Sequence, residues 1–267
     1  MSEDKSRLID SHCHLFLPDY DDDRPEVARR ADSCGVKTVV NVGLDALSSR
    51  QAIALAEEYP GYLAAVGWHP HESFNFRTEN IDELKILAQK PKVVALGEIG
   101  LDFYRLHSPQ DCQEKVFHLL LELAAEMALP VVIHTRAAFD STVSILKEHR
   151  KNLSRLLIHC FTGTWSEAKT YLELDCYFSV PGVITFPKAQ ELREALPQMP
   201  KNRLLLETDG PYLAPIPRRG RRNEPAYLTY VLEAVAEVLR LDNEETAQMT
   251  SDNARNFFGL SPDNWPK

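Results

Sequence analysis

Residues 8–14 read LIDSHCH, an apolar start that runs directly into two histidines one residue apart. The apolar start predicts a short buried strand, and side chains two positions apart on a strand point to the same face. His12 and His14 would then converge, and two neutral imidazoles held side by side can bind a divalent metal such as zinc. An ordinary pair of surface histidines would give the same letters, so the rest of the chain must decide between the two interpretations.

The composition is that of a globular protein with a sizeable core. The 267 residues carry a net charge of −9, and 44% are hydrophobic and 26% charged. This balance argues against a protein that coats nucleic acid through a basic surface. No apolar run reaches about 18 residues and residues 1–7 lack a signal-peptide pattern, so neither membrane insertion nor export is expected. Five cysteines without disulfide spacing favour a reducing cytoplasm.

Strand-like apolar runs alternate with amphipathic helical segments along the whole chain. The runs are 8–12, 38–42, 62–67, 93–98, 131–134, 156–159, 176–180 and 203–207. The helical segments are 25–34, 47–58, 81–89, 109–129, 138–150, 166–174, 189–196, 225–239, 244–249 and 253–258. Continuously apolar runs predict strands buried on both faces, as in parallel sheets. We therefore predict an α/β fold, a (β/α)8 TIM barrel of the usual length of about 250 residues. Residues 1–267 would form a single domain.

Metal-binding side chains stand where the predicted strands end. They are His12, His14, Glu98, His134, His159 and Asp209. The carboxyl ends of barrel strands share one face, and barrel enzymes build their active sites there. One histidine at a strand end is more often an ordinary buried side chain, but that explanation does not account for the whole set. His107, His118 and His149 fall in a loop or on helices, where surface roles are expected.

Several motifs around these residues resemble those of a known family. They read DSHCH at 10–14, GWHPH at 67–71, GEIGLDFY at 97–104, PVVIHTR at 130–136, HCFTG at 159–163 and LLETDGPY at 205–212. Together they make the sequence similar, nearly end to end, to the TatD-family metal-dependent hydrolases of the amidohydrolase-like superfamily. The pattern departs at Phe16, where the family often has an acidic or amide residue, and at Gly210, where it often has alanine or serine.

This resemblance implies a TatD-type deoxyribonuclease, a hydrolase that cleaves DNA phosphodiester bonds with water activated by two divalent metal ions. The implied mode is 3'-5' exonuclease action on single-stranded DNA, although the residues themselves do not fix the polarity. The ions would be zinc, manganese or magnesium. One would be held by His12, His14, Glu98 and Asp209, and the other by Glu98, His134 and His159.

Two of these carboxylates are also the predicted catalytic residues. Related barrel hydrolases often bridge two metals with a carbamylated lysine at the end of strand four, and Glu98 stands in that place. A carboxylate can bridge two ions without modification. Asp209 could orient the attacking water or accept its proton.

Other side chains are predicted to support the metals or to hold the substrate. Glu207 has the strand parity of Asp209 and could accept a hydrogen bond from a ligand imidazole, whereas Asp10 could do the same or make a plain structural contact. The candidate substrate contacts are Arg136 for a phosphate, His71 as a pocket-lining residue beside His69, and Tyr104 for stacking on a base. The arginine-rich run at 218–222 could contact a phosphate backbone or form a solvated loop.

The residues alone are also compatible with two other functions. The same metal pair could serve an amidohydrolase that acts on a small substrate with a C–N bond. A non-catalytic scaffold that binds nucleic acid is the least favoured, because it leaves the convergent side chains unexplained. The expected partner is DNA or another phosphodiester, with no membrane and no obligate protein partner.

Overall fold

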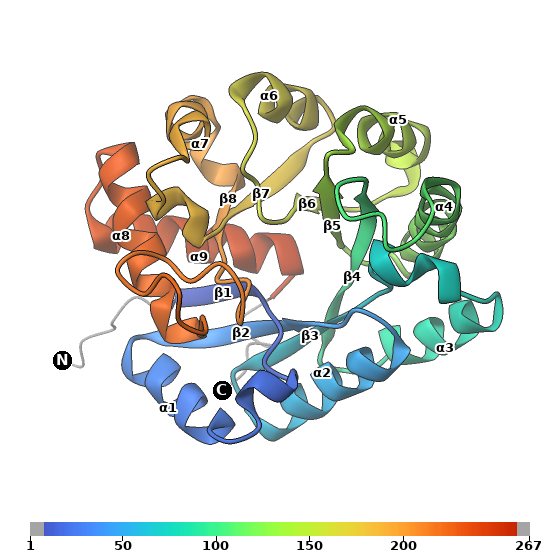
Figure 1. Cartoon of the computed structure of the whole chain (residues 1–267), viewed down its shortest axis with the longest axis horizontal. Helices are drawn as coiled ribbons and strands as arrows, with labels where there is room; N and C mark the ends of the chain where they lie inside the picture. Colours follow the sequence, from blue (N-terminus) through green and yellow to red (C-terminus); the bar gives the residue numbers. More distant parts are fainter. Residues whose placement is uncertain (1–7, 261–267) are drawn as a thin grey trace.

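A computed structural model describes residues 8–260 of the chain, and its strands form one parallel sheet. The sheet has eight strands in the order β1-β2-β3-β4-β5-β6-β7-β8, with helices around its outside (Figure 1). The strands are β1 Leu8–Cys13, β2 Val36–Val42, β3 Tyr62–Val66, β4 Val93–Asp102, β5 Val131–Arg136, β6 Leu156–Ile158, β7 Cys176–Val180 and β8 Leu204–Leu206.

The two edges of this sheet meet just beyond β8. Cys13 forms a parallel bridge with Gly210, and the Asp209 N–H donates to the His12 carbonyl at 2.9 Å. These bonds connect the first and last strands and bring the sheet close to a closed barrel. The predicted (β/α)8 barrel is confirmed.

The helices follow the predicted order with shifted ends. They are α1 Arg24–Ser33, α2 Ala46–Glu58, α3 Glu79–Ala88, α4 Gln110–Met127, α5 Phe139–His149, α6 Trp165–Glu173, α7 Gln190–Ala195, α8 Leu228–Leu239 and α9 Asn243–Phe258. Short 3-10 helices are η1 Pro18–Tyr20, η2 Pro70–Asn75, η3 Arg150–Asn152, η4 Gly182–Thr185, η5 Leu196–Gln198, η6 Lys201–Arg203 and η7 Pro225–Tyr227. The predicted break at 250–252 is absent, and inside α9 the Thr250 hydroxyl donates to the Thr246 carbonyl at 2.8 Å.

Strand β4 runs four residues beyond the predicted end at Glu98 and stops at Asp102. Its pairing with β5 is irregular between Leu96 and Ile99, and beyond this point Ile99 and Leu101 pack among the helices. The alternating positions, Glu98 and Asp102, therefore face the barrel axis. This extension places a second carboxylate of β4 beside the strand-end histidines.

The core has an outer layer between sheet and helices and an inner layer inside the barrel. The inner layer contains residues near the strand starts, such as Ile9, Leu63 and Leu157, together with Phe257 and Phe258 of α9. Helix α9 thus closes the amino end of the barrel and leaves the carboxyl end for polar side chains. Among residues 8–260, no helix is both long and apolar enough to cross a membrane.

Candidate metal centre

The histidines of the first strand face each other at the carboxyl end of the barrel. The Nε2 atoms of His12 and His14 lie 3.2 Å apart, and His14 Nε2 lies 3.5 Å from Asp209 Oδ1. His14 Nδ1 is 2.7 Å from the Val42 carbonyl oxygen, to which it can donate its proton. That hydrogen bond leaves the Nε2 lone pair of His14 facing the other donors, as metal-binding histidines require.

Glu98 lies between this pair and the histidines of β5 and the loop after β6. Its Oε1 atom is 2.5 Å from His134 Nδ1 and 2.7 Å from His159 Nε2, while its Oε2 atom is 3.4 Å from His12 Nε2. The side chain is only 3% exposed. One carboxylate oxygen therefore faces each half of the cluster, which is the position that a bridging ligand needs.

The charge of Glu98 depends on the imidazoles around it. Burial alone would raise the pKa of this carboxyl, but His159, His69 and His134 outweigh burial and hold the pKa well below its usual range. Burial and the neighbouring His159 lower the pKa of His12. A buried anion surrounded by nitrogen donors is an electrostatic setting that a divalent cation would stabilise.

His69 lies closer to the centre than a pocket-lining role requires. Its Nε2 atom is 3.6 Å from Glu98 Oε1, and burial lowers the pKa of the imidazole well below its ordinary value. A neutral imidazole at this position is available as a ligand. The sequence alone predicts that His69 lines the pocket, because counting it as a ligand would exceed the coordination that the two ions need.

Asp102 is a polar residue of the site to which the sequence analysis gave no role. Its Oδ2 atom lies 2.9 Å from His71 Nε2 and 3.3 Å from His134 Nε2, and its Oδ1 atom accepts the backbone N–H groups of Tyr104 and Arg105. The side chain is 1% exposed. Asp102 lies four positions after Glu98, so on one continuous strand both side chains point to the same face. The predicted strand ended at Glu98, and this pattern was therefore not recognised.

The two carboxylates near β1 and β8 differ in their contacts. Glu207 Oε1 lies 3.6 Å from His159 Nδ1, and its other oxygen accepts the Ser179 hydroxyl in a short hydrogen bond. Asp10 instead accepts the backbone N–H and the hydroxyl of Thr208, at 2.9 and 2.5 Å. Glu207 is therefore placed to orient His159, whereas Asp10 ties β1 to the segment after β8.

The predicted substrate contacts lie at the rim of the centre. The Arg136 guanidinium lies 4.2 Å from the centre of the Tyr104 ring, and no carboxylate of residues 8–260 pairs with it. Tyr104 is 63% exposed. His71 is the least free of the three, because its Nε2 atom is engaged by Asp102.

The arginine run at 218–222 divides into packed and exposed side chains. Arg222 forms an ion pair with Asp23 at 2.8 Å and lies over the Tyr20 ring. Arg218 contacts the hydroxyl of Tyr230 at 3.3 Å. Arg219 and Arg221 are exposed. Arg222 and Arg218 hold the loop after β8 in place, so only part of the run can reach a substrate.

The donor atoms fit divalent metal ions. Three sets, each with its atoms within 4.8 Å of one another, are His12/His14/Asp209, His12/Glu98/His159 and His69/Glu98/His134. Imidazole and carboxylate donors suit zinc, manganese and similar ions. The six predicted strand-end side chains thus lie together in one cluster, and His69 is a further member of it.

A family profile described as TatD related DNase matches residues 9–259. The chain belongs to this family. Its relatives include a Bacillus subtilis protein named uncharacterized metal-dependent hydrolase YabD, 40% identical over 95% of this chain and 100% of that protein. An Erwinia tasmaniensis protein named 3'-5' ssDNA/RNA exonuclease TatD is 39% identical, with 95% of this chain and 100% of the relative covered. The predicted family and its metal-dependent hydrolase chemistry are confirmed.

A solved TatD structure has the same fold. The Escherichia coli TatD homologue YJJV superposes with a TM-score of 0.90 at 30% sequence identity, covering 96% of this chain and 99% of the other. Both the sequence comparisons and the fold therefore agree with the metal-dependent nuclease family predicted from the motifs.

Proposed function

We propose that the chain is a 3'-5' exonuclease that hydrolyses single-stranded DNA, with two divalent ions at the candidate metal centre. The observation that carries this proposal is the position of Glu98, with one oxygen toward His12 and the other toward His134 and His159. A carboxylate shared in this way could hold a pair of ions, which would supply stabilisation for the charge that develops when a phosphodiester is hydrolysed. The related exonuclease named above supports the substrate class.

His12, His14, Glu98 and Asp209 would hold the first ion, and Glu98, His134 and His159 the second. His69 lies close enough to Glu98 to complete the second set. When bound, the ions polarise the phosphate and lower the pKa of water to about 7. The histidine-rich donors favour manganese or zinc over magnesium. The protein contributes the fixed orientation of each donor, as at the His14–Val42 hydrogen bond.

Asp209 is the proposed proton acceptor. It follows β8, and its side chain is 14% exposed, so it can reach a water molecule at the mouth of the barrel. The water oxygen forms a new bond to phosphorus, the bond from phosphorus to the leaving oxygen breaks, and Asp209 takes the proton of the water. The leaving oxygen is then protonated from solvent.

Arg136 and Tyr104 are the proposed substrate contacts. The guanidinium can donate two parallel hydrogen bonds to a phosphate, while the exposed Tyr104 ring offers a face on which a base can stack. His71, which contacts Asp102, is the third proposed contact, as a residue that lines the entrance. A single strand with splayed bases can use such contacts, whereas the bases of a duplex are stacked on each other. We also propose that the enzyme works in the cytoplasm.

A three-substrate assay tests this function. Metal-stripped protein with added manganese, zinc or magnesium is given single-stranded DNA, an aryl phosphodiester and a panel of cyclic amides. We expect metal-dependent cleavage of the first two, and a loss of at least about 100-fold in turnover for Asp209→Asn. Cleavage of an amide alone would identify an amidohydrolase instead. Binding of DNA without any cleavage would favour the scaffold.

A further inference from the structure

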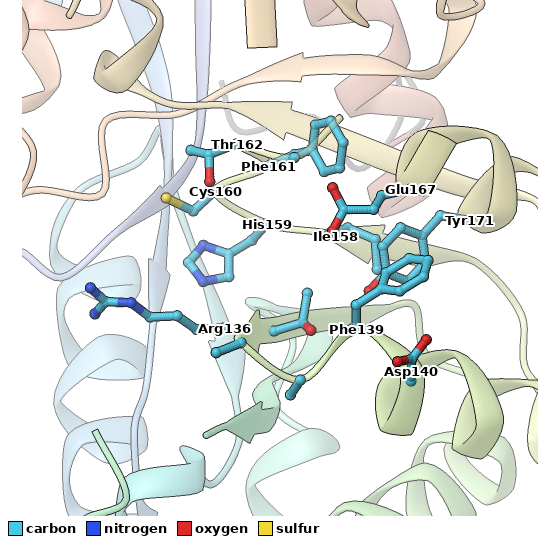
Figure 2. Close-up of a pocket in the computed structure, with 14 residues that line it drawn as sticks. Arg136, Phe139, Asp140, Ile158, His159, Cys160, Phe161, Thr162, Glu167 and Tyr171 are labelled. Carbon is cyan, nitrogen blue, oxygen red and sulfur yellow. The ribbon is translucent and has the colours of Figure 1, made fainter. Parts of the chain in front are cut away.

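A pocket of about 360 Å³ opens beside the candidate metal centre (Figure 2). It lies between the loop from β5 to α5 and the loop from β6 to α6. His159 belongs both to this pocket and to the metal centre, so a molecule held by the metals can extend directly into it. This volume is near the lower end of the range of ligand pockets, about 300–1,000 Å³. It suits one nucleotide rather than two.

The two ends of the pocket carry opposite charge. Figure 2 shows Arg136 at one end, on the side of His159, with Asp140 and Glu167 at the other. No residue among 8–260 neutralises the Asp140 carboxylate through an ion pair. Glu167 uses Oε2 to accept the Thr164 N–H at 2.7 Å, which leaves its second oxygen available.

Aromatic side chains form part of the wall between these ends. Phe139 and Tyr171 lie edge to face with ring centres 5.3 Å apart, and both line the pocket. Phe161 lines it from the β6 side and is buried. The ring faces and edges offer apolar contact for a sugar or base without reading its sequence.

Resting on the proposed exonuclease function, we infer that this pocket binds the 3'-terminal nucleotide and selects a free 3'-hydroxyl over a 3'-phosphate. The cationic end next to the metals takes the phosphate that is cleaved. The sugar then places its 3' end toward Asp140 and Glu167. A hydroxyl can donate a hydrogen bond to these carboxylates, whereas a phosphate carries about −1.5 to −2 charge and is repelled.

The orientation also defines the product. Water adds to the phosphorus at the metal centre, and the bond from phosphorus to the 3' oxygen of the preceding nucleotide breaks. The pocket then holds a nucleoside 5'-monophosphate, and the shortened strand regains a 3'-hydroxyl. Each product strand is therefore a substrate for the next cycle, as an exonuclease requires.

The test compares two single-stranded oligonucleotides that differ only in a 3'-hydroxyl or a 3'-phosphate. Repulsion by one exposed and one half-buried carboxylate predicts about tenfold higher kcat/KM for the hydroxyl end. In the Asp140→Asn/Glu167→Gln double variant this ratio should fall toward one. Glutamine keeps the hydrogen bond to the Thr164 N–H, so helix α6 should remain capped.

Glu173→Gln is the control for α6, since it removes one negative charge from an exposed position of that helix outside the pocket. It should keep the wild-type ratio. Competition by nucleoside 5'-monophosphates provides a second measurement that does not need efficient turnover by the variant. A nucleoside 5'-monophosphate should inhibit wild-type aryl phosphodiester cleavage more strongly than a nucleoside 3',5'-bisphosphate, and the double variant should lose this preference.

The outcomes separate this inference from the proposed function. An active wild-type enzyme with equal rates on both ends, or a double variant with the wild-type ratio, would overturn the pocket assignment and leave the nuclease intact. Failure of the wild-type protein on both oligonucleotides and on the aryl phosphodiester, with each metal supplied, would overturn the proposed function and the inference together.

Discussion

The two carboxylate oxygens of Asp102 contact different groups. One oxygen accepts the backbone N–H groups of Tyr104 and Arg105 at 2.9 and 2.8 Å, which fixes the side chain. The other oxygen faces the ring nitrogens of His71 and His134. His134 Nδ1 is directed at Glu98, so a carboxylate at its Nε2 atom holds the ring in the orientation that a metal ligand needs. Because Asp102 Oδ2 contacts both rings, it also connects His134 to His71 at the rim of the centre.

We expect Asp102→Asn to weaken the second ion selectively. The amide keeps the shape but loses the charge that holds His134, and losses of about 10–100-fold in metal affinity are typical of such contacts. Calorimetric titration of manganese into metal-stripped protein measures the two sites separately. The first site, with His12 and His14, should be retained. Asp111→Asn, at an exposed position of α4, is the control. Equal weakening of both sites would show that Asp102 acts on the whole centre.

At the scale of elements, much of the site could be predicted from strand ends alone. His12, His134 and Asp209 lie far apart in sequence, but parallel strands bring their carboxyl ends to one face. The two residues missed or underrated, Asp102 and His69, depend on finer geometry. The irregular pairing of β4 after Leu96 sets which later residues face inward, and no sequence period reports such an irregularity.

Ion pairs between residues far apart in the chain also could not be predicted from the sequence. The sequence predicts that Arg222 either contacts a phosphate backbone or lies in a solvated loop, but it pairs with Asp23 almost 200 positions earlier. Only the folded barrel brings α1 beside the loop after β8. Likewise, the polar stretch around Thr250 resembled a break between two helices, because a side chain that bonds its own helix backbone gives no apolar signal.

Helix α9 supplies the element-scale prediction. Phe257 is 0% exposed inside the barrel cluster, with its ring centre 4.8 Å from that of Phe258 and 5.4 Å from that of Tyr177. Phe257→Ala should lower the free energy of unfolding by about 3–5 kcal/mol, because it removes apolar contact and leaves a cavity. Urea unfolding measures the loss. Turnover well below the melting temperature should be retained, since the metal centre lies at the other end. A change below 1 kcal/mol would contradict the packing role.

At the scale of the whole molecule, ion pairs join the first helix to the last barrel loop. Arg30 donates to Glu224 at 2.7 Å and to Asp23 at 3.1 Å, and Arg222 completes the group. Hydrogen bonds from Arg222 and then from Arg30 lower the pKa of Asp23 to about 2 from its ordinary 3.8. Because the folded pKa is depressed, this stabilisation is complete above pH 3.8 and is lost as the pH falls toward 2.

The difference in unfolding free energy between wild type and Asp23→Asn should therefore be constant above pH 4 and shrink below it. The side chain is partly exposed, so we expect the full difference to be no more than about 1 kcal/mol. Urea unfolding at a series of pH values measures it. Asp22→Asn, an exposed neighbour, should show no such trend. A difference that persists undiminished at pH 2 would refute the ion-pair explanation.

The exposed arginines of the loop after β8 should contribute to the binding of single-stranded DNA through their charge alone. The chain has a net charge of −9, so Arg219 and Arg221 form a local exception in the loop after β8. If both contact phosphates, the Arg219→Ala/Arg221→Ala variant should flatten the log–log salt dependence of single-strand binding by about 0.7 for each contact. Metal affinity should not change. Lys151→Ala, beyond the end of α5, provides the control, and an unaltered slope in the double variant would assign these arginines to the solvated surface.

The central claim is that Glu98 bridges two metal ions that act on a phosphodiester. Anomalous diffraction from a crystal soaked with manganese and a dinucleotide tests it most directly. We predict two peaks about 3.5–4 Å apart, one on each side of the Glu98 carboxylate, with the phosphate of the dinucleotide between them and its 3' nucleotide in the pocket. A single peak, or two peaks of which one lies away from Glu98, would contradict the claim.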